Sequence, residues 1–122
     1  MARVLYVDDD LDLCEIAEIS LQWDPGLEVR VCSSGREALN IVAEWRPDII
    51  LLDVMMPDMD GPNTLKRLRA LPAASDVPVV FVTARVQPQE IVELEDLGII
   101  DFIQKPYEPL TLAASVRKYL NK

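Results

Sequence analysis

The chain has 122 residues, of which 50% are hydrophobic and 27% are charged. This length and composition fit one folded domain over residues 1–122 and exclude a mainly disordered protein. The formal net charge of -9 disfavours direct binding to nucleic acid and to anionic membrane surfaces, because both are negatively charged. No apolar run approaches the roughly 20 residues that cross a bilayer, and the N-terminus lacks a signal-peptide pattern, so we expect a cytoplasmic protein.

The types of side chain present limit the possible chemistry. The sequence contains no histidine, which excludes a histidine nucleophile, an imidazole zinc site and a histidine phospho-acceptor. Cys14 and Cys32 lie in apolar stretches, and we expect both to be buried free thiols rather than a disulfide. Any phosphoryl chemistry in this chain must therefore use carboxylates.

Short apolar segments typical of β-strands alternate five times with segments of helical periodicity. The strands are expected at Val4 to Val7, Leu27 to Cys32, Ile49 to Leu52, Val79 to Val82, and around Ile100 to Ile103. All but the second are nearly uniform apolar runs, which are typical of strands covered on both faces of a parallel sheet. In the second strand Glu28 and Arg30 alternate with apolar residues, so we expect it at an edge of the sheet.

Helical segments follow the strands. Their inward faces are expected at spacings of three and four residues, formed by Leu13, Ile16, Ala17 and Leu21, then Ala38, Ile41, Val42 and Trp45, and finally Leu112, Val116, Tyr119 and Leu120. Asp10 and Ser34 are expected N-caps, while Pro62, Pro88 and Pro109 fall in the expected first turns of the third, fourth and fifth helices. This order predicts an α/β fold with a doubly wound, five-stranded parallel sheet and right-handed crossovers.

The residues at the strand ends are the candidates for chemistry, because ligands bind at the carboxyl ends of the strands in an open parallel sheet. These residues are Asp8, Asp9, Asp10, Asp53, Thr83 and Lys105. Clustered carboxylates without histidine or cysteine favour Mg²⁺. A carboxylate beside such an ion can attack phosphorus, with Lys105 as a fixed cation and Thr83 as a hydroxyl donor.

Each of these residues has a plainer interpretation when it is taken alone. The acidic triplet could be an N-cap with solvated charge, and Lys105 could be an ordinary surface lysine before a turn. Their joint occurrence at the ends of four separate strands favours a functional site.

Over its whole length the sequence resembles the receiver domain of bacterial two-component response regulators. The resemblance rests on Asp8 and Asp9, on Asp53 within Leu51 to Pro57, on the loop Asp58 to Gly61, on Thr83 with Ala84, and on Lys105 with Pro106. It implies a single receiver domain over residues 1–122 with the (βα)5 flavodoxin-like or CheY-like fold and the strand order 2-1-3-4-5.

The resemblance also implies the roles of the site residues. Asp53 would accept a phosphoryl group from a sensor histidine kinase or a histidine phosphotransfer protein, and Lys105 would pair with that group. Mg²⁺, for which Mn²⁺ could substitute, would be held by Asp8, Asp9, Asp53 and the backbone carbonyl of Met55. The peptide bond between Lys105 and Pro106 is expected to be cis.

A switch is implied as well, with Thr83 moving toward the phosphoryl group and Phe102 filling the space it leaves. The readout would lie on the fourth helix, fifth strand and fifth helix, at about residues 88–120, and would act on an output domain, an output protein or a phosphorylation-dependent dimer. Met55 and Arg85 lie where the family tunes hydrolysis of the acyl phosphate. The domain would be regulatory rather than an enzyme, assisting its own phosphotransfer and autodephosphorylation.

Three alternative interpretations of these residues compete with this one. A phosphatase of the haloacid dehalogenase type needs a second aspartate two residues after the nucleophile, where this chain has Met55. An EF-hand register through Gly61 would place its first and last ligands at Met56 and Arg67, which are both unsuitable. A degenerate receiver that acts as an unphosphorylated interaction scaffold remains the alternative.

Overall fold

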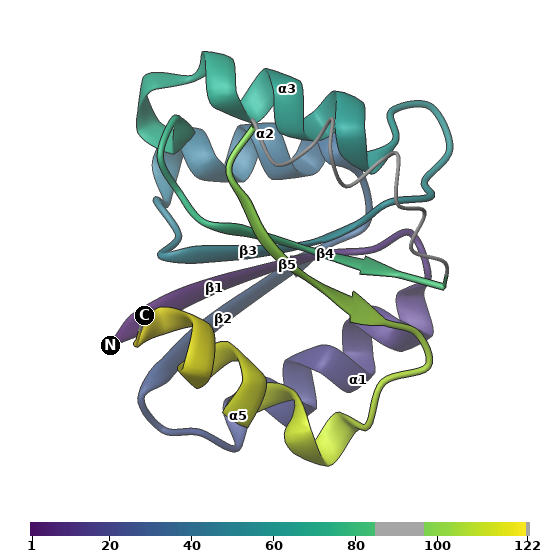
Figure 1. Ribbon diagram of the computed structural model, residues 1–122, viewed down its shortest axis with the longest axis vertical. Helices are drawn as coiled ribbons and strands as arrows, with labels where there is room; N and C mark the ends of the chain where they lie inside the picture. The colour runs from purple at the N-terminus through teal and green to yellow at the C-terminus, as the bar shows by residue number, and fades with distance from the viewer. Residues whose placement is uncertain (85–96, 122) are drawn as a thin grey trace.

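The computed structural model describes residues 1–84 and 97–121, which form a five-stranded parallel sheet with helices on both faces (Figure 1). The strand order is β2-β1-β3-β4-β5, which confirms the predicted fold and topology. The strands are β1 (Ala2–Val7), β2 (Leu27–Cys32), β3 (Ile49–Asp53), β4 (Val79–Thr83) and β5 (Ile99–Gln104).

Helices α1 and α5 cover one face of the sheet, and α2 and α3 cover the other (Figure 1). The helices are α1 (Leu11–Gln22), α2 (Gly35–Glu44), α3 (Gly61–Ala70) and α5 (Pro109–Leu120), and a short 3-10 helix, η1 (Pro72–Ala74), follows α3. The fourth helix expected near Pro88, and Arg85 before it, lie outside the described residues. None of the helices in the part of the chain that the structure describes is long and apolar enough to span a membrane.

The helix starts are fixed by side-chain caps. The Asp10 carboxylate accepts hydrogen bonds from the backbone N–H groups of Asp12 and Leu13, and the Ser34 hydroxyl accepts one from Glu37, as predicted. Helix α3 is capped by the Asp60 side chain and has Pro62 in its first turn. The same arrangement begins α5, where Pro109 is the first helical residue.

The core is divided between the two faces of the sheet. Strands β3 and β4 and the last four residues of β1 are buried throughout, as their uniform apolar runs predicted. On the α2/α3 face Leu5, Leu52 and Phe81 pack with Leu65 and Leu68. On the other face, α1 and α5 pack against the sheet. The buried residues there include Val4 and Tyr6 of β1, Ile49 and Leu51 of β3, Ala17 and Leu21 of α1, and Leu112 and Val116 of α5. Cys14 and Cys32 are buried free thiols, as expected.

Two expectations about burial were wrong. Strand β5 is partly exposed rather than covered on both faces, because it is the second edge of the sheet and a register shift against β4 leaves Ile100 without a paired residue. In α1 the side chain of Ile16 is 39% exposed, and the buried face instead includes Cys14 and Ser20. Ser20 is tolerated there because its hydroxyl donates to the carbonyl of Ile16 at 2.6 Å.

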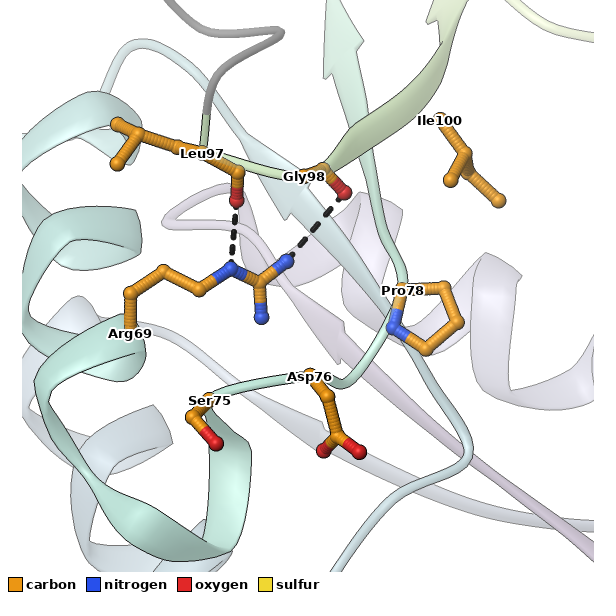
Figure 2. Close-up of a pocket in the computed structure, with 7 residues that line it drawn as sticks. All are labelled: Arg69, Ser75, Asp76, Pro78, Leu97, Gly98 and Ile100. Atoms are coloured by element: carbon orange, nitrogen blue, oxygen red, sulfur yellow. Dashed lines mark hydrogen bonds between the residues drawn. The ribbon is translucent and has the colours of Figure 1, made fainter.

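Arg69 fastens the amino end of β5 to the end of α3. Figure 2 shows its guanidinium group donating to the carbonyl oxygens of Leu97 at 2.6 Å and Gly98 at 3.3 Å. A third bond reaches the carbonyl of Ala74 at 2.8 Å. The surrounding cavity of about 370 Å³ is lined by Pro78 and other residues at the amino ends of β4 and β5, opposite the strand ends that carry the candidate site.

Candidate functional site

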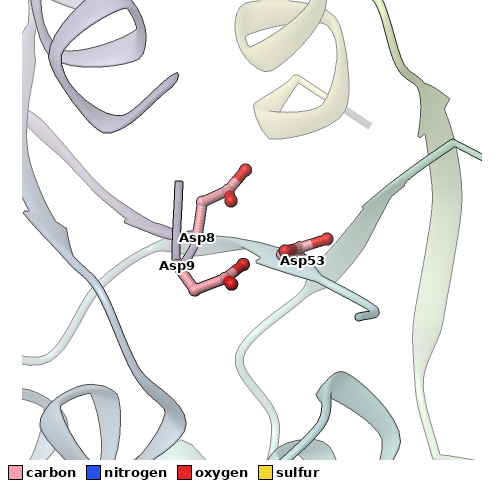
Figure 3. Close-up of side chains that lie close together, drawn as sticks. All are labelled: Asp8, Asp9 and Asp53. Atoms are coloured by element: carbon pink, nitrogen blue, oxygen red, sulfur yellow. The ribbon is translucent and has the colours of Figure 1, made fainter. Parts of the chain in front are cut away.

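The three predicted carboxylates meet at the carboxyl ends of two neighbouring strands. Strands β1 and β3 pair in parallel with Val7 opposite Leu52, so Asp8 and Asp9 follow β1 beside Asp53, the last residue of β3. One oxygen from each carboxylate lies within 4.8 Å of the others (Figure 3). Asp8 and Asp53 are buried, whereas Asp9 is exposed. The structure therefore places two carboxylates inside the protein and one at its rim.

Lys105 binds both buried carboxylates. Its Nζ atom lies 2.8 Å from Oδ2 of Asp8 and 3.2 Å from Oδ1 of Asp53. The backbone N–H of Lys105 donates to the carbonyl of Thr83 at 2.7 Å, which holds the lysine beside the end of β4. Burial alone would lower the pKa of Lys105, but hydrogen bonds and charge from the two carboxylates, Asp8 foremost, outweigh it and raise the pKa.

The same surroundings raise the pKa of Asp53 to about 7. Burial is the largest cause, and the negative charge of Asp8 is the next. The positive charge of Lys105 lowers the pKa of Asp53 but offsets only part of this effect. Ionisation of Asp53 is therefore unfavourable in the metal-free protein, and an additional cation beside it would favour the ionised form.

A tyrosine within the apolar run of β1 also reaches the site, which its place in that run does not predict. Tyr6 is fully buried in β1, and its hydroxyl donates to Oδ2 of Asp8 at 3.2 Å. The hydroxyl groups of Tyr6 and Tyr107 are 2.9 Å apart. The spacing of Tyr6 and Asp8 in the sequence indicates that the two side chains can meet, because residues two apart on a strand point to the same face.

Thr83 and Phe102 lie on neighbouring strands near this site. Thr83 is buried as the last residue of β4. Phe102 on β5 is half-buried, and its ring packs against that of Phe81, its cross-strand partner, with the ring centroids 5.9 Å apart. The side chain of Met55 is 77% exposed, and its backbone N–H lies 3.4 Å from Oδ1 of Asp53. The peptide bond between Lys105 and Pro106 is cis.

The loop after Asp53 packs against the backbone of the site. A Cβ atom on Gly61, the first residue of α3, would lie 2.5 Å from the Asp53 carbonyl oxygen and 2.8 Å from Cα of Val54. Only glycine fits there without moving the end of β3. Asp58 in this loop has a φ of 70°, and its carboxylate accepts a hydrogen bond from Nε of Arg36 at 2.8 Å.

The donor atoms of the site suit a hard divalent cation. Asp8, Asp9 and Asp53 offer carboxylate oxygens, which Mg²⁺ prefers to nitrogen or sulfur. The nearby thiol of Cys14 donates to the backbone carbonyl of Asp8 at 3.0 Å, and burial raises its pKa to about 11, so it supplies no thiolate at neutral pH. Repulsion between the carboxylates adds to the attraction for such an ion.

Comparisons with known proteins point to one family. Residues 4–117 match the model of the response regulator receiver domain. The DNA-binding response regulator MtrA of Mycobacterium tuberculosis (strain ATCC 25618 / H37Rv) is 40% identical over 120 residues, which are 98% of this chain and 51% of MtrA. The response regulator MprA of Mycobacterium leprae (strain TN) is 38% identical over the same share of each chain. The chain spans about half the length of the curated relatives it matches.

Solved structures agree in fold. Chemotaxis protein CheY4 of Vibrio cholerae superposes with a TM-score of 0.89 at 33% identity, covering 97% of this chain and 98% of CheY4. The non-phosphorylated HemR receiver domain of Leptospira biflexa superposes with a TM-score of 0.87 at 26% identity, covering 100% of this chain and 96% of that domain. The sheet order and the two helical layers are therefore those of these proteins.

Proposed function

The chain belongs to the response regulator receiver domain family, and on that basis we propose that it is a phosphoryl-accepting switch whose acceptor is Asp53. The observation that carries this proposal is the position of Asp53, a buried carboxylate that contacts the ammonium group of Lys105 and lies beside the carboxylates of Asp8 and Asp9. A strand-end carboxylate that faces a fixed cation is suited to nucleophilic attack on phosphorus. The receiver domain is proposed to occupy residues 1–122.

Asp8, Asp9, Asp53 and the backbone carbonyl of Met55 would hold Mg²⁺, or Mn²⁺ in its place. When bound, the ion supplies positive charge that offsets the charge on the acceptor and on the transferring oxygens. Lys105 bonds to Asp53 in the present structure and would turn its ammonium group toward the phosphoryl oxygens after transfer. The same residues would assist autodephosphorylation. Because the only group they act on is carried by the domain itself, the domain would be regulatory rather than an enzyme acting on a separate substrate.

The donor would be a histidine kinase or a histidine phosphotransfer protein. An apolar groove of about 410 Å³ adjoins Lys105 and offers a place for the helix that carries the donor histidine. The groove is lined by Leu13, Ile16, Ala84, Lys105, Pro106, Tyr107 and Pro109. Ile16→Asp is expected to slow transfer from a histidine kinase that phosphorylates the wild type, and to leave transfer from acetyl phosphate unchanged. Equal rates from the kinase would contradict the docking role.

Phosphorylation would add roughly -1.5 to -2 charges at Asp53. Thr83 would move toward this charge, and Phe102 would fill the space that Thr83 leaves. The readout would use β5 and α5, together with the fourth helix, and would act on an output domain, a separate protein or a dimer partner. A Thr83→Ala variant that still takes phosphate should gain less partner affinity than the wild type on phosphorylation; an equal gain would refute the coupling.

The proposal is tested by the intact mass of the chain after incubation with acetyl phosphate, with and without Mg²⁺. We expect the mass of one phosphoryl group to be added only with Mg²⁺, and Asp53→Asn to prevent the addition. No gain from acetyl phosphate or from a cognate kinase would favour the alternative function, an unphosphorylated interaction scaffold. A gain that persists in Asp53→Asn would place the acceptor elsewhere.

A further inference from the structure

The hydroxyl groups of Tyr6 and Tyr107 form a chain of hydrogen bonds that ends on Asp8. Tyr6 lies in β1 and Tyr107 in the loop between β5 and α5, and their hydroxyl oxygens are 2.9 Å apart. The Tyr6 hydroxyl also lies 3.2 Å from Oδ2 of Asp8, the oxygen that binds Lys105. These hydrogen bonds therefore connect β1, which Asp8 follows, with the loop that carries Lys105.

The direction of this chain follows from the number of protons available. An ionised Asp8 can only accept hydrogen bonds, and a tyrosine hydroxyl has one hydrogen to donate. Tyr6 must therefore donate to Asp8, which leaves its oxygen to accept the hydrogen of Tyr107. Each bond in such a chain polarises the next, so Tyr107 strengthens the bond that Tyr6 makes to Asp8.

Tyr6 is the side-chain donor that would remain on Asp8 in the proposed reaction. Oδ1 of Asp8 accepts the backbone N–H of Asp10 at 2.9 Å, and Oδ2 accepts Tyr6 and Lys105. When Lys105 turns to a phosphoryl group on Asp53, Oδ2 keeps Tyr6 alone as its side-chain donor within the described residues. Tyr6 is held in place by its full burial in a central strand.

We propose that Tyr6 is a positioning residue that holds Asp8 in the orientation needed for a divalent cation, and that Tyr107 acts through Tyr6. This inference rests on the proposed function, because it assigns Asp8 to the Mg²⁺ site. Hydrogen bonds to metal-binding carboxylates orient them, and their removal typically weakens metal binding by about 10- to 100-fold.

The test measures the dissociation constant of Mg²⁺ by isothermal titration calorimetry and the phosphorylation rate with acetyl phosphate across a range of Mg²⁺ concentrations. Tyr6→Phe keeps the buried ring and removes only the hydroxyl, and we expect it to raise the dissociation constant about tenfold. The rate at saturating Mg²⁺ should stay within about twofold of the wild type, since a positioning role acts through metal affinity. Urea unfolding confirms that the variant is folded.

Two further variants separate positioning from general disturbance. Tyr107→Phe should raise the dissociation constant less than Tyr6→Phe does, and the double variant should match Tyr6→Phe, because Tyr107 acts only through Tyr6. Tyr119→Phe is the matched control: it removes a 2.8 Å hydrogen bond from a tyrosine to Asp101 on β5, outside the acidic cluster, and should leave Mg²⁺ binding unchanged.

The possible results distinguish the inference from the proposed function. If the wild type binds Mg²⁺ and is phosphorylated, but Tyr6→Phe changes neither its dissociation constant nor its rate by more than about twofold, the inference fails alone. A defect that persists at saturating Mg²⁺ also overturns it. If the wild type binds no Mg²⁺ and takes no phosphate, the proposed function and the inference fail together.

Discussion

Replacing Asp53 by asparagine should change how the stability of the metal-free protein depends on pH. The pKa of Asp53 in the folded chain is about 7, above its ordinary value of 3.8, chiefly because the carboxyl group is buried and next because Asp8 is close. Between these two values the folded chain keeps a proton that the unfolded chain has lost. The resulting stability is fully present below 3.8 and is lost as the pH rises through 7. Asparagine resembles the protonated acid at every pH, so the variant should not lose this stability as the pH rises.

The size of the effect follows from the two pKa values. Each unit of difference corresponds to about 1.4 kcal/mol. Most of the transition lies between pH 5 and pH 8, where the wild type should lose roughly 2 to 3 kcal/mol of unfolding free energy through Asp53. The chain has no histidine that would titrate in this range. Titrating groups that do not contact Asp53 are shared by both proteins and cancel in the comparison.

The assay is urea unfolding of the wild type and Asp53→Asn at pH 5 and pH 8 in a metal chelator. The variant should be the more stable protein at both pH values, and its advantage should be roughly 2 to 3 kcal/mol larger at pH 8 than at pH 5. Addition of Mg²⁺ at pH 8 should restore stability to the wild type more than to the variant, because the acceptor carboxylate is one of the proposed ligands. Parallel pH profiles for the two proteins would refute this account of Asp53.

Four other changes test separate parts of the structure. Gly61→Ala should lower the unfolding free energy by roughly 1 to 3 kcal/mol, because its Cβ atom would contact the backbone at Asp53; Gly26→Ala, which meets the movable end of an arginine side chain, is the matched control and should cost less. Phe81→Ala removes a fully buried ring and should cost roughly 3 to 5 kcal/mol in urea unfolding, and a loss below about 1 kcal/mol would contradict its core role. Lys105→Met should slow phosphorylation by acetyl phosphate roughly a hundredfold, since a preorganised positive group is lost, and a rate near that of the wild type would remove Lys105 from the proposed chemistry. Met55→Ala should change the decay rate of the phosphorylated protein, as followed by mass spectrometry, because this exposed side chain lies two residues from Asp53.

The uniform apolar strands were predictable because burial on both faces leaves a direct mark in the sequence. The ends of these strands, and with them Asp8, Asp53 and Lys105, followed from the same pattern together with the geometry of parallel sheets. Strand β5 was misjudged because its edge position and register shift depend on pairing with β4, which composition does not reveal. Tyr6 was missed because aromatic residues favour strands for their bulk, and its hydroxyl gained a role only when Tyr107 met it from a distant part of the chain.

The three carbonyl bonds of Arg69 give strand β5 one fixed end. The guanidinium group joins the turn before β5 to the end of α3 and to η1. The amino end of the strand therefore cannot shift without breaking the hydrogen bonds to Leu97 at 2.6 Å and Gly98 at 3.3 Å. A displacement that begins at the carboxyl end, beside Thr83 and Lys105, must therefore tilt the strand about this anchor rather than slide it along its axis. This tilt would move the exposed edge of the sheet most at the end nearest Asp53 and least at Gly98.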